Sequence, residues 1–102
     1  MNLKPGNRLR SVTDTTEVVV VRSTVDDIDL RCGGAAMVPH GIDAAVVGPP
    51  AAGFDAGTRV GKRYEDVDSG CELLCTKAGP GSLSIGMRAL TLKDAKALPS
   101  SD

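Results

Sequence analysis

The chain has 102 residues, a formal net charge of −1 and only two aromatic residues, Phe54 and Tyr64. This length allows one domain or two very small lobes, and the balanced charge argues against a nucleic-acid surface, which needs a basic stripe. No stretch approaches the apolar length of a membrane helix, so we expect no insertion into a membrane.

The N-terminus and the cysteines indicate the cellular compartment. Residues 1–11 lack the apolar core of a secretory signal. The three cysteines are an odd number, which makes a poor disulfide framework. We therefore expect a cytoplasmic protein.

The first part of the chain predicts a β-hairpin. A short strand over 8–12 precedes Glu17–Arg22, whose four consecutive valines pack well on a pleated sheet. An acidic turn at 23–27 leads to a second strand at 28–32, where apolar and polar residues alternate. The unbroken valine run indicates a strand covered on both faces, by the core and by a neighbour or partner. The candidate interface is this run: Val18, Val19, Val20 and Val21.

Residues 39–57 differ in composition, because they are rich in Gly, Ala and Pro and nearly uncharged. We interpret them as a connector that contains at most a short strand at 44–47. Strands are predicted again beyond the connector, at 59–67, 71–77 and 82–85. Residues 91–99 begin with Thr91 as a helix N-cap and end at Pro99, which predicts a short helical turn.

The two halves of the chain share one order of features. Shifting the sequence by 55 positions places Glu17 on Glu72 without gaps across about 27 positions. The other matches are Gly6 with Gly61, Arg8 with Arg63, Val12 with Val67, and Ile28 and Leu30 with Leu83 and Ile85. The prediction is an all-β fold of two small repeated hairpin units, 1–38 and 58–102, joined by the connector 39–57 in one compact domain. Coincidence between two similar hairpins is the alternative.

Each unit resembles desulforedoxin and the N-terminal domain of desulfoferrodoxin. The family pattern is Gly-x-x-Tyr-x-Cys-x-x-Cys-Gly, then a Glu-led strand ending in Lys-Ala-Gly, then Leu-x-Cys-Cys-Gly-x-x-Met. The second unit offers "GKRYEDVDSG" and "ELLCTKAG", and the first offers "EVVVVRS" and "LRCGGAAM". The resemblance implies a rubredoxin-like fold with four thiolates around each iron.

The ligand positions that this resemblance implies have lost their sulfur. They fall on Ser11, Asp14, Cys32 and Gly33 in the first unit, and on Asp66, Ser69, Ile85 and Gly86 in the second. A tetrathiolate site needs deprotonated sulfur, and Gly and Ile provide no side-chain ligand atom. We therefore expect the scaffold without the iron chemistry, and no cofactor.

A rearranged metal site is the alternative. Cys71 and Cys75 lie four residues apart, which in a strand separates them by about 13 Å, so they would not bind one ion together. Zinc or iron could still be held by residues that meet after folding, drawn from Cys32, His40, Cys71 and Cys75. A disulfide between Cys32 and Cys75 is a further alternative, and ordinary core cysteines with a solvated His40 are the simplest interpretation.

No complete catalytic constellation is visible in the sequence. We therefore predict a non-catalytic accessory subunit or protein-interaction module that binds a larger cytoplasmic enzyme, through strand edges open to β-augmentation. Self-association into a homodimer would satisfy the same need. The other hypotheses are a small zinc or iron protein, and a small-molecule binder that uses the connector as a pocket wall.

Overall fold

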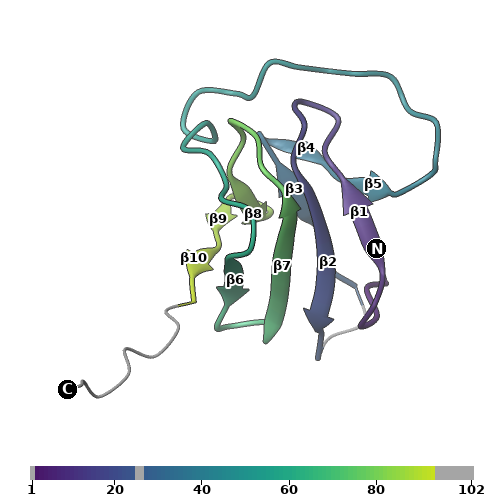
Figure 1. Ribbon diagram of the computed structural model, residues 1–102. Coiled ribbons are helices and arrows are strands. Elements are labelled where there is room, and N and C mark those ends of the chain that lie inside the picture. Colours follow the sequence, from purple (N-terminus) through teal and green to yellow (C-terminus); the bar gives the residue numbers. More distant parts are fainter. Residues whose placement is uncertain (1, 25–26, 94–102) are drawn as a thin grey trace.

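The computed structural model describes residues 2–24 and 27–93, and these residues form an all-β structure with two antiparallel sheets (Figure 1). They contain no helix, and hence none long and apolar enough to cross a membrane. The strands are β1 (Arg8–Arg10), β2 (Glu17–Arg22), β3 (Leu30–Cys32), β4 (Ala35–Ala36), β5 (Val38–Pro39), β6 (Arg63–Asp66), β7 (Cys71–Lys77), β8 (Leu83–Ile85), β9 (Arg88–Ala89) and β10 (Thr91–Leu92).

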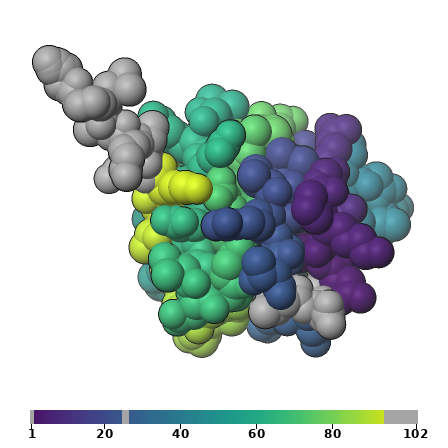
Figure 2. All heavy atoms as spheres, turned by 90° about the horizontal axis from the view of Figure 1, so that it is seen from below, coloured from purple at the N-terminus to yellow at the C-terminus, as the bar shows by residue number. Residues whose placement is uncertain are grey.

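In each sheet, the two halves of the chain meet at one pair of neighbouring strands. The six-stranded sheet has the order β10-β6-β7-β2-β1-β5, and the four-stranded sheet has the order β4-β3-β8-β9. The junctions are therefore β2 with β7 and β3 with β8. Seen from below in Figure 2, most of the first half lies on one side and most of the second half on the other.

Outward from each junction, the strands of the two halves follow in corresponding order. In the larger sheet β2, β1 and β5 correspond to β7, β6 and β10, and in the smaller sheet β3 and β4 correspond to β8 and β9. Val19 pairs with Leu74 at the middle of the β2–β7 ladder, and the register shifts at both ends of that ladder. The Gly6 amide donates to the Val20 carbonyl, and the Gly61 amide, 55 positions on, donates to the Cys75 carbonyl.

The same backbone contacts recur in the smaller sheet at a different spacing. The Met37 amide donates to the Leu30 carbonyl, and the Leu90 amide donates to the Leu83 carbonyl, a spacing of 53. The ungapped alignment that placed Leu30 on Ile85 is therefore wrong beyond the turn that follows β2. A spacing of 53 places Leu30 on Leu83, its counterpart in hydrogen bonding.

The core lies between the two sheets and is almost entirely aliphatic. Alternate residues of β2 and β7 point into it, so that Val18, Val20 and Leu73 are at most 2% exposed. They pack with side chains of the four-stranded sheet, and Tyr64 packs only at the margin. The cluster consists of Leu3, Leu9, Val18, Val20, Ile28, Leu30, Cys32, Met37, Cys71, Leu73, Leu83 and Leu90.

The predicted pairing of the valine strand with residues 28–32 is wrong. Those residues contribute β3, which belongs to the other sheet, and β2 has β1 and β7 as its neighbours. The hairpins that form are β1–β2, β6–β7, β3–β4 and β8–β9. The β3–β4 turn needs Gly33 and Gly34 because both have positive φ, 67° and 86°, as two-residue hairpin turns often require.

The connector has no strand over residues 44–47, in keeping with the little regular structure expected there, and Val46 and Val47 are 78% and 62% exposed. It arches over one end of both sheets (Figure 1). Backbone hydrogen bonds attach it there, from Val47 to Val12 and from Ala51 to Gly33.

The predicted helical turn at 91–99 begins instead as strand β10, which pairs with β6. Edge pairing satisfies the backbone groups that a helical turn would have satisfied internally. Residues 94–99 lie outside the described residues.

Two neighbouring leucines of β7 allow a matched test of this core. Leu73 is fully buried and Leu74 is half-buried on the opposite face. We expect Leu73→Ala to lower the free energy of unfolding by about 2–5 kcal/mol, because the site cannot fully close around the cavity. Leu74→Ala should cost less than half as much in urea denaturation. Equal losses would contradict the assignment of the two faces.

Candidate functional site

Three of the four ligand positions predicted for the first unit meet at one end of the molecule. The Ser11 hydroxyl accepts hydrogen bonds from the amides of Thr13 and Asp14, at 3.0 Å and 3.2 Å. The Cys32 thiol donates to Asp14 Oδ1 at 3.7 Å. Gly33 follows directly and contributes only backbone groups: its amide donates to the Ser82 carbonyl, and its carbonyl accepts from the Ala51 amide.

The Asp14 carboxylate ties the first half of the chain to the second. It accepts hydrogen bonds from the Thr16 hydroxyl, at 2.9 Å, and from the Gly81 amide. A β-carbon at Gly81 would lie 2.6 Å from Asp14 Oδ2, so this approach requires glycine. Thr16 also contacts Thr58, with 3.1 Å between the hydroxyl oxygens. A hydrogen-bonded carboxylate thus stands at the corner where the resemblance places an iron.

The pKa shifts of Asp14 and Cys32 do not favour a reactive thiol at this corner. Burial opposes ionisation of Asp14, but hydrogen bonds from Ser11, Gly81 and Thr16 outweigh it and lower the pKa of the carboxyl. Burial, and then the charge of Asp14, raises the pKa of the Cys32 thiol to about 11. Asp14 is therefore a poor base for Cys32, which keeps its proton at neutral pH.

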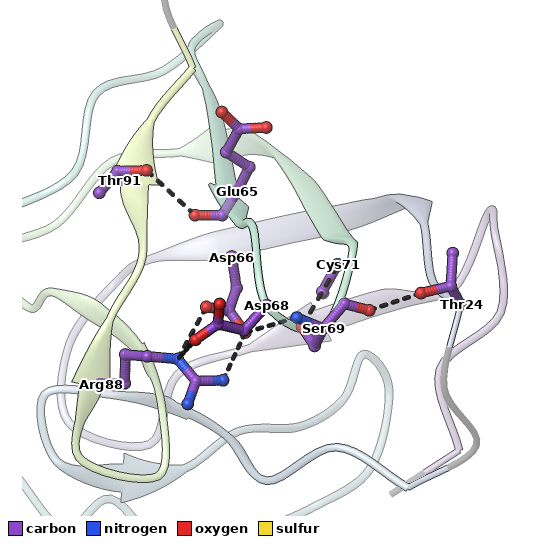
Figure 3. A network of polar contacts seen from close by, with 8 residues as sticks. All are labelled: Thr24, Glu65, Asp66, Asp68, Ser69, Cys71, Arg88 and Thr91. Carbon is purple, nitrogen blue, oxygen red and sulfur yellow. Dashed lines mark hydrogen bonds and ion pairs between the residues drawn. The ribbon is translucent and has the colours of Figure 1, made fainter.

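The second corner is organised around Asp66 (Figure 3). Arg88 donates two hydrogen bonds to this carboxylate, from Nε at 2.8 Å and from Nη2 at 2.6 Å, and lies 3.8 Å from Asp68. The Ser69 amide donates to Asp66 Oδ2 at 3.3 Å, and the Thr24 hydroxyl donates to the Ser69 carbonyl.

The other two positions predicted for the second unit play no part in this network. Ile85 packs against the core, and the Gly86 amide donates to the Asp29 carbonyl. Sequence reasoning missed Arg88, which neutralises Asp66. No local spacing in the sequence pointed to this pair.

The Asp66 carboxylate is held in its ionised form. The Arg88 hydrogen bonds, opposed by burial and aided by Ser69, lower its pKa to about 2. Burial, and then the charge of Asp66, raises the pKa of the neighbouring Cys71 thiol to about 11. This corner is an ion-paired turn without a reactive thiol.

The residues of the proposed rearranged metal site do not come together. All three cysteines are buried free thiols, so no Cys32–Cys75 disulfide forms. Cys75 donates to the Lys77 carbonyl, while His40 lies 3.6 Å from Glu17 on the outer side of the larger sheet. Within residues 2–24 and 27–93, no group of three or more His, Cys, Asp or Glu side chains could hold a metal ion.

The outer face of the six-stranded sheet, the face turned away from the core, offers a second candidate site. Residues paired directly across an antiparallel ladder lie on the same face. The register therefore places Arg8, Val19, Leu74 and Arg63 in one row across β1, β2, β7 and β6. Val19 and Leu74 are half-buried. Val21 lies at the register shift between Val20 and Arg22, so the pairing assigns it to neither face.

The structure divides the predicted valine interface between two faces. Val18 and Val20 are core residues, 1% and 2% exposed, and no partner can reach them. Val19 remains a candidate on the outer face, and Val21 is half-buried at the register shift of the β2–β7 ladder. The valine run is therefore covered by the core on one side only, within the described part of the chain.

Basic residues gather on this outer face around two glutamates. Glu72 is 4% exposed and contacts Lys93 at 2.9 Å, Arg63 at 3.3 Å and Arg22 at 4.0 Å. Its hydrogen bond to Lys93, opposed by burial and aided by the charges of the three cations, lowers its pKa. Glu17 occupies the corresponding place on β2.

The contacts of Glu17 repeat this arrangement. Its carboxylate lies 3.6 Å from His40 and 4.0 Å from Lys77. Glu72 thus lies among three cationic side chains, and Glu17 lies beside one, Lys77. Sequence reasoning missed this face because its members are far apart in the chain.

A groove of about 510 Å³ adjoins the outer face next to β1 and β5. Arg8 and His40 contribute its ionisable side chains, and Leu3, Leu9 and Pro39 contribute much of its apolar wall. The groove is lined by residues 2–9 and by the first two residues of the predicted connector, Pro39 and His40.

Comparison with known protein families, curated proteins and solved structures finds no match to this chain.

The thiol environments predict slow alkylation of the native protein. Only the thiolate reacts with iodoacetamide, and burial raises the pKa of Cys32 and Cys71 to about 11. Mass spectrometry should show all three cysteines protected at neutral pH and all three modified in denaturant. Rapid modification of Cys32 in the folded protein would contradict the raised pKa of this thiol beside Asp14.

The Asp66–Arg88 ion pair predicts a loss of stability in acid. A folded-state pKa of about 2 lies below the ordinary value of 3.8, so the carboxylate stabilises the fold above 3.8 and stops doing so as the pH falls toward 2. Asp66→Asn should lower the melting temperature at neutral pH and flatten this acid limb. Asp68→Asn is the matched control, since Asp68 is 76% exposed. An acid limb unchanged in Asp66→Asn would contradict the assignment.

Proposed function

We propose that this protein is a non-catalytic interaction module, an accessory subunit that docks onto another protein through the outer face of its six-stranded sheet. The observation that carries the proposal is the unequal burial of the two faces of the six-stranded sheet. Val18, Val20 and Leu73 are sealed against the second sheet, whereas Val19 and Leu74 have no covering layer among the described residues.

The site chemistry supports a binding role over a catalytic one. The ionisable groups with clear shifts inside the fold are held in their resting forms, with carboxylates ionised and thiols protonated. A general acid or base instead needs a pKa near the working pH. The carboxylates of Asp14 and Asp66 accept hydrogen bonds from neighbouring turns, which supports a structural role for both corners.

The face is a better docking surface than the strand edges. The edge strands β4, β5, β9 and β10 have two residues each, and β5 ends in a proline, which has no amide to donate. So little free backbone is a weak template for β-augmentation. The proposal therefore moves the predicted contact from the edges to the outer face.

We also propose that the chain consists of two copies of one unit, related to the desulforedoxin scaffold. The backbone contacts that recur at spacings of 55 and 53 support the duplication. The meeting of Ser11, Asp14 and Cys32 at one corner supports the relation to that scaffold. In this proposal, carboxylate networks replace the metal in both copies.

Affinity capture from native cells tests the docking role. The double variant Val19→Ser/Leu74→Ser removes the apolar centre of the face, and we expect it to lose the captured partner. Complete burial of one such side chain contributes about 1.5–3 kcal/mol, so losing two should weaken binding at least about tenfold. The control is Val67→Ser/Met87→Ser, at exposed positions outside the outer face.

Two results would overturn the docking role. One is recovery of the protein alone at monomer mass from native cells. The other is stoichiometric zinc or iron that is lost on Cys32→Ser, since this would favour the metalloprotein alternative.

A further inference from the structure

We infer that the outer face recognises an acidic protein surface, with carboxylates on either side of an apolar contact. This inference rests on the proposed docking role and adds the chemistry of the partner. It starts from the distribution of charge, which is balanced in the sequence but uneven in the fold.

Half of the basic residues of the chain lie on or beside the outer face. Six of the twelve Lys and Arg residues are there, with three of the thirteen Asp and Glu residues. The basic set is Arg8, Arg10, Arg22, Arg63, Lys77 and Lys93, and the acidic set is Glu17, Glu65 and Glu72. Among the other described residues, five are basic and seven are acidic. Within the part of the chain that the structure describes, the outer face is therefore positive and the rest is negative, which favours a negatively charged partner.

The central row fixes where the positive charges lie relative to the apolar side chains of the outer face. Arg8 and Arg63 are the outer members of the row, on strands separated by β2 and β7. Neighbouring strands lie about 4.8 Å apart, so the two backbones are about 14 Å apart. Val19 and Leu74 fill the space between them. A partner that fits this row carries an apolar side chain at its centre and carboxylates on both flanks.

Arg8 is the more available of the two arginines. Within the described residues no ion pair reaches its guanidinium, whereas Arg63 already contacts Glu72. Arginine binds a carboxylate with two parallel hydrogen bonds, which adds direction to the attraction. The groove beside Arg8 extends the surface available to the partner.

A second copy of this chain fits the face poorly. Two copies that meet through the same face would bring two sets of six basic residues together, and like charges at an interface are costly. The charge distribution therefore disfavours the homodimer that the sequence suggested, at least through this surface.

Nucleic acid also fits poorly. Single strands bind to platforms of aromatic side chains in basic grooves, and this face is centred on Val19 and Leu74. Phe54 and Tyr64 are the only Phe, Tyr or Trp residues of the chain, and Tyr64 packs toward the core.

Fluorescence anisotropy with defined probes tests the inference. The probe is a labelled peptide that contains Glu-Ser-Leu-Ser-Glu, which in an extended chain places both glutamates and the leucine on one face. The comparison probes are the same peptide with lysine in place of glutamate and a single-stranded DNA. We expect binding to the glutamate peptide only. Raising the salt from about 0.1 M to 1 M shortens the Debye length from about 10 Å to 3 Å and should weaken this binding.

Charge reversal locates the site. Arg8→Glu/Arg63→Glu should weaken binding of the glutamate peptide at least tenfold. The matched control is Lys4→Glu/Arg59→Glu, which makes the same change in net charge at exposed positions, 55 residues apart, in the turns before β1 and β6. If the first variant fails to fold, Arg8→Gln/Arg63→Gln should give a smaller loss in the same direction.

Several outcomes would overturn the inference. They are absent binding of the glutamate peptide, equal loss in the control variant, tighter binding of DNA, or a dimer that dissociates on Arg8→Glu/Arg63→Glu. Capture of the partner from native cells separates failure of this inference from failure of the docking role. If serine at positions 19 and 74 abolishes capture while charge reversal leaves it intact, the face is a docking surface for a partner of different chemistry.

Discussion

The pairing of β2 with β7 is the interaction on which the remainder of this structure depends. It joins the two halves of the six-stranded sheet and fixes which side chains point inward. Successive residues of a strand alternate between faces, so a slip of one residue would move Val18 and Val20 to solvent and Val19 to the core. The register therefore sets the composition of the core and of the outer face at the same time.

Small β proteins need further constraints at the ends of their strands, because a chain of this size buries limited apolar surface. Two carboxylates serve this purpose here. Asp14 holds the loop after β1 to the turn before β8, and Asp66 holds the β6–β7 turn to β9. In both cases an acidic side chain accepts several hydrogen bonds, which favours its ionised form and makes acid the condition that weakens the fold.

The sequence predicted the two central strands with their observed bounds, because β2 and β7 are rich in β-branched and aliphatic residues. It did not predict that β2 and β3 belong to different sheets. Local alternation shows that a segment is a strand, but the choice between β1, β3 and β7 as neighbours depends on tertiary packing. The predicted helix signal at Thr91 lost to pairing with β6 for the same reason.

The candidate site was predicted in part. The resemblance to desulforedoxin led to Ser11, Asp14 and Cys32, which meet in the fold, and to Asp66 with Ser69. Arg88, as the partner of Asp66, followed from no spacing rule. The basic outer face was not predicted, because Arg8, Arg63 and Lys93 become neighbours only when strands from both halves are placed side by side. The alternation of Arg8, Leu9 and Arg10 was a local signal of one part of it.

Native-state hydrogen exchange of the β2 and β7 amides tests the central junction most directly. If the two halves depend on this pairing, these amides exchange only through global unfolding, and their opening free energy equals that of the whole protein. Exchange from β7 and β6 through a smaller opening, while β1 and β2 stay protected, would show that the halves are stable separately and would contradict this account.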